Sequence, residues 1–216
     1  MALILDPLQK QRMRNILLYI SSIFFAISLN AQSPIESVSK IYFRSHPFDM
    51  RFSSFVTSLQ QDPWFTLERI HRRTDSNFFF MTGTYKNFNP FRYSPTELRL
   101  VIAEEEIIHA DSLKTRDTII NLQLMGITDT GMVNMKAVEK EFKRFVSNHS
   151  GRFSSSMHET FADGGEGYNY FISPFTISPV TVAWGLLKTR QYTFTITVRF
   201  KLRENVATYI LVPGEQ

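Results

Sequence analysis

Cysteine is absent from this chain of 216 residues. Without a thiol there is no disulfide, no thiolate metal site and no lipid attached to a cysteine. Small secreted eukaryotic domains usually depend on disulfides, so their absence favours a bacterial periplasm or cell exterior. The chain is 43% hydrophobic and 20% charged, a composition that can bury a core without covalent cross-links.

The signatures of several enzyme classes are missing as well. His158-Glu159 lacks the second histidine of the H-E-x-x-H motif, which excludes that class of metalloprotease. There is no G-x-S-x-G nucleophile elbow, no G-x-G-x-x-G and no phosphate loop. We therefore expect no catalytic residues and no cofactor.

Metal ligands are sparse. His109-x-Asp111 has no evident third ligand, so a surface pair is favoured over a metal site. The segment 163–167, Asp-Gly-Gly-Glu-Gly, has too few carboxylates for the 6–8 oxygen ligands of calcium. We expect a plain loop there and no metal in the protein.

Excess charge is also missing once the N-terminus is considered. The formal charge is +4, and residues 1–31 hold three cations, Lys10, Arg12 and Arg14, and one anion, Asp6, which leaves the rest near +2. A balance so close to zero gives no reason to expect a nucleic-acid partner.

The N-terminus reads as an export signal. A basic stretch ends at Arg14, and an uncharged apolar run covers residues 16–29, shorter than the ~20 residues of a comfortable membrane span. We predict a signal peptide over residues 1–31 with cleavage after Ala31; an uncleaved anchor and a start at Met13 are the alternatives. The Leu-Asn-Ala-Gln junction resembles exported proteins of the Bacteroidota.

The strongest periodic pattern lies at residues 192–202. Tyr192, Phe194, Ile196, Val198, Phe200 and Leu202 alternate with three threonines, an arginine and a lysine. Side chains of a strand point to opposite faces in turn, so the pattern predicts one buried face and one solvated face. The helix expected at 132–148 should cover the apolar face.

The other elements follow from apolar periodicity and from turn residues. We expect an irregular lead-in at 32–47 with a short edge strand at 41–43, a helix at 48–61, and strands at 64–74, 78–85, 97–110 and 116–127. After the helix at 132–148, further strands are expected at 152–156, 168–172, 180–188 and 206–212.

This order predicts an α+β protein with antiparallel sheets each covered by one helix. Each half places a helix before four strands, and the two helices share the pattern F-x-x-F-V at Phe52 and Phe142. The arrangement resembles the cystatin-like topology, which implies a tandem α-β4 repeat with a first lobe at 32–129 and a second at 130–216. No inhibitory motif accompanies the resemblance.

Twenty phenylalanines against two tryptophans suggest a Phe-rich core or, alternatively, an aromatic cavity. The candidate ligand-binding residues are Phe78 and Phe80, two residues apart on one expected strand, and the histidines His71 and His158. We expect an exported, non-catalytic binding module for an unknown protein or apolar small molecule, with no stable membrane span after signal cleavage. The alternative is a small-molecule enzyme or a lipid carrier with a Phe-lined pocket.

Overall fold

The fold is described from a computed structural model, which covers residues 34–72, 79–108, 116–172, 178–203 and 205–208. A helix at 34–42 opens the described chain. The elements that follow are η1 (Pro47–Asp49), α2 (Phe52–Gln61), β1 (Phe65–Arg72), β2 (Phe79–Tyr85), β3 (Glu97–Ile108), β4 (Arg116–Thr128), α3 (Met132–His149), η2 (Ser150–Arg152), β5 (Ser155–Thr160), β6 (Glu166–Phe171), β7 (Val180–Leu186), β8 (Tyr192–Arg203) and β9 (Val206–Thr208).

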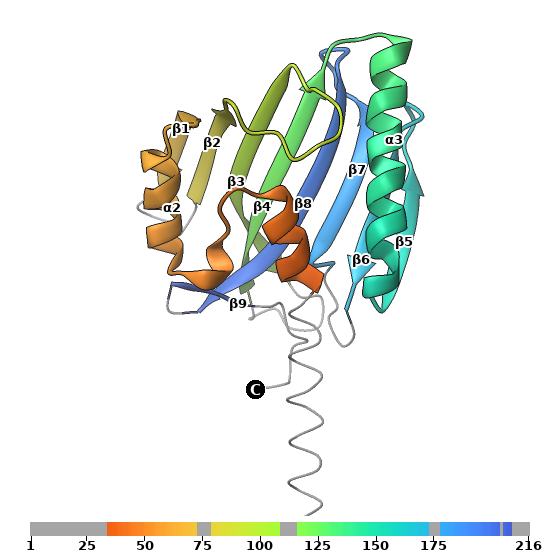
Figure 1. The fold of residues 1–216 in the computed structure, drawn as a ribbon. Helices are drawn as coiled ribbons and strands as arrows, with labels where there is room; N and C mark the ends of the chain where they lie inside the picture. Colours follow the sequence, from red (N-terminus) through yellow and green to blue (C-terminus); the bar gives the residue numbers. More distant parts are fainter. Residues whose placement is uncertain (1–33, 73–78, 109–115, 173–177, 204, 209–216) are drawn as a thin grey trace, which may run out of the picture.

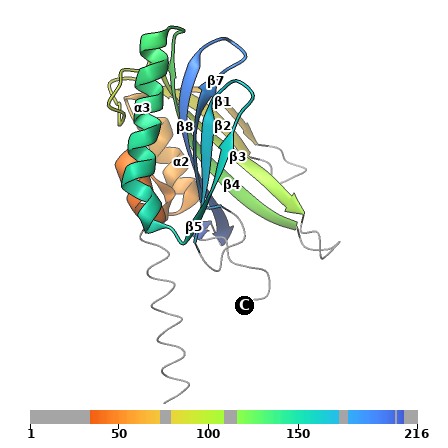
Figure 2. The same ribbon diagram turned by 90° about the vertical axis from the view of Figure 1, so that its right-hand side faces the viewer.

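The strands form one antiparallel sheet in the order β1-β2-β3-β4-β8-β7-β6-β5, with β9 also paired to β8. The helix at 34–42, α2 and α3 all lie on the same side of this sheet (Figures 1 and 2). The protein is therefore α+β, as the sequence predicts, with one covered face and one face that no described helix covers.

The expectation of separate sheets, each with its own helix, is corrected. Each half does supply a helix followed by four antiparallel strands, but β4 and β8 pair along ten residue positions, from Ile119 opposite Lys201 to Thr128 opposite Tyr192. This pairing joins the two halves into one sheet. Phe52 of α2 accordingly contacts both Phe79 of β2, at 5.5 Å between ring centroids, and Phe200 of β8, at 6.2 Å.

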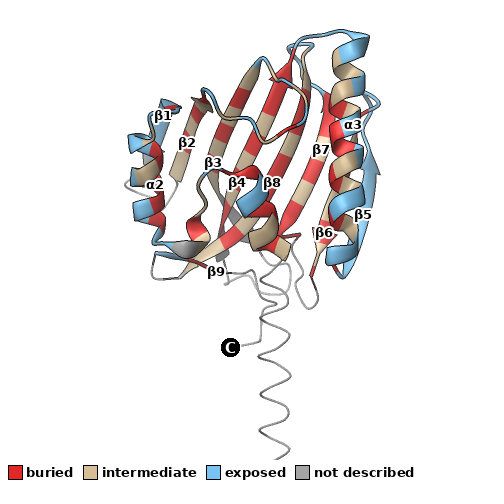
Figure 3. Cartoon of the chain, in the orientation of Figure 1, coloured by how far each residue is buried: buried red, intermediate tan, exposed pale blue. Residues whose placement is uncertain are grey.

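The register predicted for β8 is confirmed on its apolar side. Phe194, Ile196, Val198 and Phe200 are fully buried beneath the helices, and Figure 3 shows the alternation of buried and less buried residues along the strands. On the other side the expectation of exposed threonines is wrong in part, because Thr193 and Thr197 are also buried. Their strand is central, so residues of β4 and β7 lie on either side of these threonines on the same face of the sheet.

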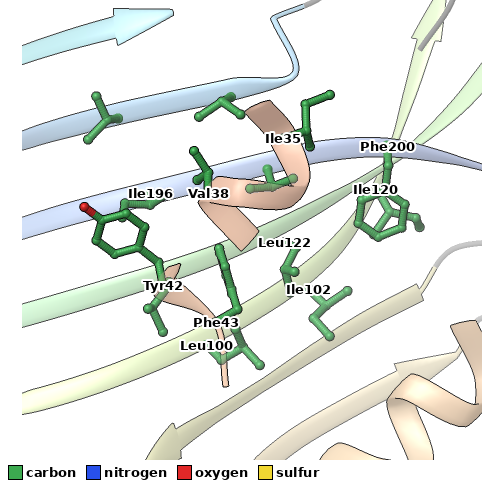
Figure 4. Packing of buried hydrophobic residues seen from close by; sticks show 14 of the residues in the cluster. Ile35, Val38, Tyr42, Phe43, Leu100, Ile102, Ile120, Leu122, Ile196 and Phe200 are labelled. Carbon is green, nitrogen blue, oxygen red and sulfur yellow. The ribbon is translucent and has the colours of Figure 1, made fainter. Parts of the chain in front are cut away.

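The irregular lead-in expected at 32–47 is wrong as well, since residues 34–42 form a helix. Ile35, Val38 and Tyr42 make one buried stripe at helical spacing, and Ser39 is buried beside them. Figure 4 shows these side chains over the middle of the sheet, near Leu122 and Ile196. The centre of the core is therefore closed by this helix, and α3 covers the adjacent strands β7 and β8.

Both long helices bury the stripes expected from their sequences, with Phe52 and Phe55 in α2 and Phe142 and Phe145 in α3. At least ten of the 20 phenylalanines are buried in the single core. Phenylalanine therefore fills the core here, as the first of the two interpretations expects. No helix among the described residues is long and apolar enough to span a membrane.

Candidate functional site

The face of the sheet opposite the helices carries the best candidate site. We call it the open face, and it contains Thr195 and Arg199 of β8 together with their register partners. One register row crosses five strands on this face and consists of His71, Phe80, Ala103, Asn121 and Arg199. Directly opposed residues of antiparallel strands lie on the same side of a sheet, so these five side chains share the open face.

A chain of hydrogen bonds extends this row to the other end of the sheet. Nη1 of Arg199 donates to Oγ1 of Thr181 at 2.6 Å and to the carbonyl oxygen of Ser178 at 3.2 Å. Thr181 in turn donates to Oδ1 of Asn169 at 2.8 Å. Asn169 donates through Nδ2 to Oε1 of Glu159 at 2.9 Å. Side chains of four adjacent strands, β8, β7, β6 and β5, are thus held in fixed positions.

On the other side of Arg199, Asn121 of β4 is its register partner and donates to Oε2 of Glu105 at 2.9 Å. We call Glu159, Asn169, Thr181, Arg199, Asn121 and Glu105 the polar row. Arg199 is half-buried, and its burial lowers the pKa of the guanidinium, while the nearby Glu105 carboxylate raises it. Arginine nevertheless stays protonated, so the row holds a fixed positive charge near its centre.

Hydroxyl and amide groups lie near the centre of the open face, next to the apolar register partners Met125 and Ala183. Gln123 of β4 donates from Nε2 to Oγ1 of Thr197 at 3.2 Å, and the hydroxyls of Thr193 and Thr195 lie 3.4 Å apart. These groups can donate and accept hydrogen bonds, whereas the Thr181 hydroxyl already has Arg199 and Asn169 as partners. The arrangement is suited to binding a polar surface rather than to activating a nucleophile.

The candidate residues from the sequence are placed as follows. Phe80, which is half-buried, and His71, which is exposed, are register partners on the open face. Phe78 lies outside the described residues. His158 sits in β5 on the helix side, where its Nε2 is 3.0 Å from Oε2 of Glu166 and its ring is 4.6 Å from that of Tyr168.

The structure therefore does not bring the two histidines together. His71 belongs to β1 and His158 to β5, the two ends of the sheet, and their side chains lie on opposite faces. Seven strand spacings separate them, roughly 34 Å at about 4.8 Å per spacing. Any site that includes one of them excludes the other.

A second cluster of polar side chains is buried on the helix side of the sheet. The Glu141 carboxylate is paired with the Arg144 guanidinium and accepts a hydrogen bond from the backbone N–H of Arg92 at 3.2 Å. His149 lies about two turns after Glu141 on α3. Its ring centroid is 5.9 Å from that of Tyr42 and 4.5 Å from that of Phe145. These contacts attach α3 to the helix at 34–42, through Tyr42, and to the loop before β3, through Arg92.

His149 is the most perturbed of these groups. Burial, with the positive charges of Arg152 and Arg144, lowers the pKa of its imidazole from 6.5 to about 4. Its Nδ1 atom is buried and has no hydrogen-bond partner in the described part of the chain. No role is predicted for His149 from the sequence. The residue falls on the apolar stripe of α3 one turn after Phe145, and that position is the signal for its burial.

Metal ligation finds no support in the part of the chain that the structure describes. No group of three or more histidine, aspartate or glutamate side chains there could hold an ion. In the loop predicted at 163–167, Oδ1 of Asp163 accepts from Gly165 N at 3.0 Å and Oδ2 accepts from Leu186 N at 2.7 Å. This carboxylate ties the loop to the end of β7. The pair His109-x-Asp111 lies outside the described residues.

No family model, no curated protein sequence and no solved structure matches this chain, so its function has to be argued from its own residues and geometry.

Proposed function

We propose that the protein is an exported, non-catalytic binding module that binds a protein partner on the open face. The observation that carries the proposal is the polar row, a set of side chains already held by hydrogen bonds across a sheet face without a helix cover (Figure 2). Side chains fixed before binding lose little conformational entropy when a partner arrives, which favours association.

The charges of the open face support a protein partner over a polyanion. Arg199 lies in the field of Glu105, and Nε of Arg99 is 2.7 Å from Oε1 of Glu97. Glu68 lies 3.8 Å from the same arginine. Cations and carboxylates thus alternate, and nothing resembles the one-sided positive patch of a nucleic-acid site. Protein interfaces are about as polar as ordinary protein surface, which fits this mixture.

Export is supported by the sequence of residues 1–31 and by the lack of cysteine. The alternative, an enzyme or apolar-ligand carrier with a Phe-lined pocket, is disfavoured by the packing of the rings. Phe52 contacts both Phe55 and Phe79, and Phe145 contacts Phe194, so these side chains are occupied by core contacts. We accordingly assign the phenylalanines to stability and the binding role to the open face.

We also propose that the halves 32–129 and 130–216 are related as α-β4 repeats of cystatin-like topology. The strand order supports this, because β1-β2-β3-β4 and β5-β6-β7-β8 run inward from the two ends and meet at β4 and β8. The matching phenylalanines Phe55 and Phe145 are both fully buried.

The binding proposal can be tested with a photo-crosslinking amino acid placed at Thr195, half-buried at the centre of the open face, in the protein's own cell envelope. The matched control places it at Lys140, exposed on α3 on the other side of the sheet. We expect a discrete protein adduct at Thr195 and none at Lys140. Ala183→Arg, which adds a long cation beside Thr195 on β7, should abolish the adduct without lowering the melting temperature. The same adducts at both positions, or none at Thr195, would refute the proposal.

A further inference from the structure

The two outer strands of the sheet differ in how well their free edges are protected. In β1 the pairing register shifts between Leu67 and Arg69, and the strand carries Glu68, Arg69 and His71. Bulges and charges on an edge strand hinder pairing with another chain. This edge of the sheet is therefore protected against a further strand.

The edge formed by β5 has less of this protection, because it has no bulge and its only charged or ionisable side chains are those of His158 and Glu159. All six residues of β5, Ser-Ser-Met-His-Glu-Thr, are exposed, and the strand contains no proline, lysine or arginine. Its pairing with β6 runs without a register shift from Ser155 opposite Phe171 to Thr160 opposite Glu166. Among the described strands β5 pairs only with β6, so one side of its backbone is available.

The hydrogen-bonding direction of each β5 residue follows from the turn that leads into β6. Phe161 N donates to Gly165 O at 2.8 Å, which makes this pair a hydrogen-bonded one. Bonded and non-bonded pairs alternate along an antiparallel ladder. Ser155, Met157 and Glu159 therefore bond to β6, and the N–H and C=O groups of Ser156, His158 and Thr160 point away from the sheet.

We propose that β5 pairs with β5 of a second copy of this chain, antiparallel, about a two-fold axis that passes beside Met157. In this register Met157 lies opposite Met157 of the second copy. Ser156 of each copy lies opposite His158 of the other, and Ser155 lies opposite Glu159. The outward backbone groups of Ser156 and His158 then meet, and the open faces of the two copies become continuous. Because the axis is perpendicular to the sheet, the same strand serves both copies and the assembly closes as a dimer.

Side-chain chemistry selects this register over its neighbours. An axis beside Glu159 would oppose two carboxylates, and like charges directly opposite destabilise a sheet. An axis beside His158 would place the apolar Met157 opposite the Glu159 carboxylate. An axis beside Ser156 would leave three residues of β5, His158, Glu159 and Thr160, without a β5 partner, whereas the axis beside Met157 leaves only Thr160. The register at Met157 covers an apolar side chain that is 49% exposed in the single chain.

The lack of cysteine makes this register directly measurable, because one introduced thiol is the only thiol in the chain. In the proposed pair the two Met157 residues form a non-hydrogen-bonded pair with Cα atoms about 4.5 Å apart, within the range that a disulfide spans. Met157→Cys should form a disulfide-linked dimer under mild oxidation. Ser155→Cys and Glu159→Cys are matched controls, because each residue lies roughly 13 Å from its own copy along the strand and should not cross-link.

A second variant tests the backbone pairing. Ser156→Pro removes an N–H group that points away from β6, so the fold should keep its melting temperature and its circular dichroism. We expect the mature wild-type protein to be a dimer by sedimentation equilibrium and Ser156→Pro to be a monomer. A monomeric wild type, a Ser156→Pro protein that stays dimeric, or equal cross-linking of all three cysteine variants would overturn the proposal.

Discussion

The buried imidazole of His149 should make the stability of the protein depend on pH. The side chain is 3% exposed and lies between the rings of Tyr42 and Phe145. Burial, together with the positive charges of Arg152 and Arg144, lowers its pKa to about 4. The folded protein therefore holds this histidine neutral in a range where the unfolded chain would protonate it.

The sign and the size of the effect follow from linkage. Between pH 6.5 and about 4 the unfolded state binds the proton more tightly, so the free energy of unfolding is full above pH 6.5 and falls as the pH drops toward 4. A difference of about 2.5 pKa units at about 1.36 kcal/mol each gives an upper limit of roughly 3 kcal/mol. Glu141, also buried in this region, is paired with Arg144 and does not neutralise the imidazolium directly.

The assay is urea unfolding of the mature protein at several pH values from 7 to 4.5, for the wild type and for His149→Gln. We expect the glutamine variant to be less stable than the wild type at pH 7. Its free energy of unfolding should fall less as the pH drops, because it lacks the titrating imidazole. His158→Gln is the matched control, because that histidine is exposed at the edge of the sheet and the variant should follow the wild-type curve. If the free energy of unfolding fell equally with pH in the wild type and in His149→Gln, the reasoning would be refuted.

Three further predictions concern packing and processing. Phe145→Ala should lower the free energy of unfolding by about 3–5 kcal/mol in denaturant titrations, because the ring is fully buried in the core, and an unchanged midpoint would contradict that packing. Gly83→Ala should destabilise by roughly 1–3 kcal/mol, because a Cβ there would collide with the Phe65 ring and the Thr66 carbonyl; Gly151→Ala, with open space around the Cβ, is the control for thermal melting. N-terminal peptide mass spectrometry of the envelope fraction should find a mature chain that begins at Gln32, and full-length protein in the cytosol would contradict export.

Local periodicity was sufficient for much of the fold. The expected helix at 132–148 agrees with α3 to within one residue, and the apolar side of β8 is buried as its alternation predicts. Both signals repeat over ten or more residues, so chance matches are few. The helix at 34–42 was missed because it spans only nine residues and begins at Pro34 after two polar residues. It also ends in Ile41-Tyr42, which together with Phe43 reads equally well as a strand.

Contacts between distant segments were decided only by the tertiary structure. The pairing of β4 with β8 joins segments about 70 residues apart, and no pattern within either strand specifies its neighbour. The burial of Thr197 follows from this pairing, because Gln123 and Thr181 flank it on adjacent strands. A threonine in an alternating sequence indicates only that it faces away from the core, and the strands on either side determine whether water reaches it.

The candidate site depends on the tertiary structure in the same way. Phe80 and His71 could be singled out from the sequence, because an aromatic cluster and a histidine are distinctive even when isolated. Asn169, Thr181 and Arg199 look like ordinary surface residues, and they become a row only when β6, β7 and β8 lie side by side in one register. The sequence alone determines the composition and most element types, and it predicts an export signal, since these depend on neighbours along the chain. The single sheet and its polar row required the folded structure, because hydrogen bonds between strands depend on which segments meet in space.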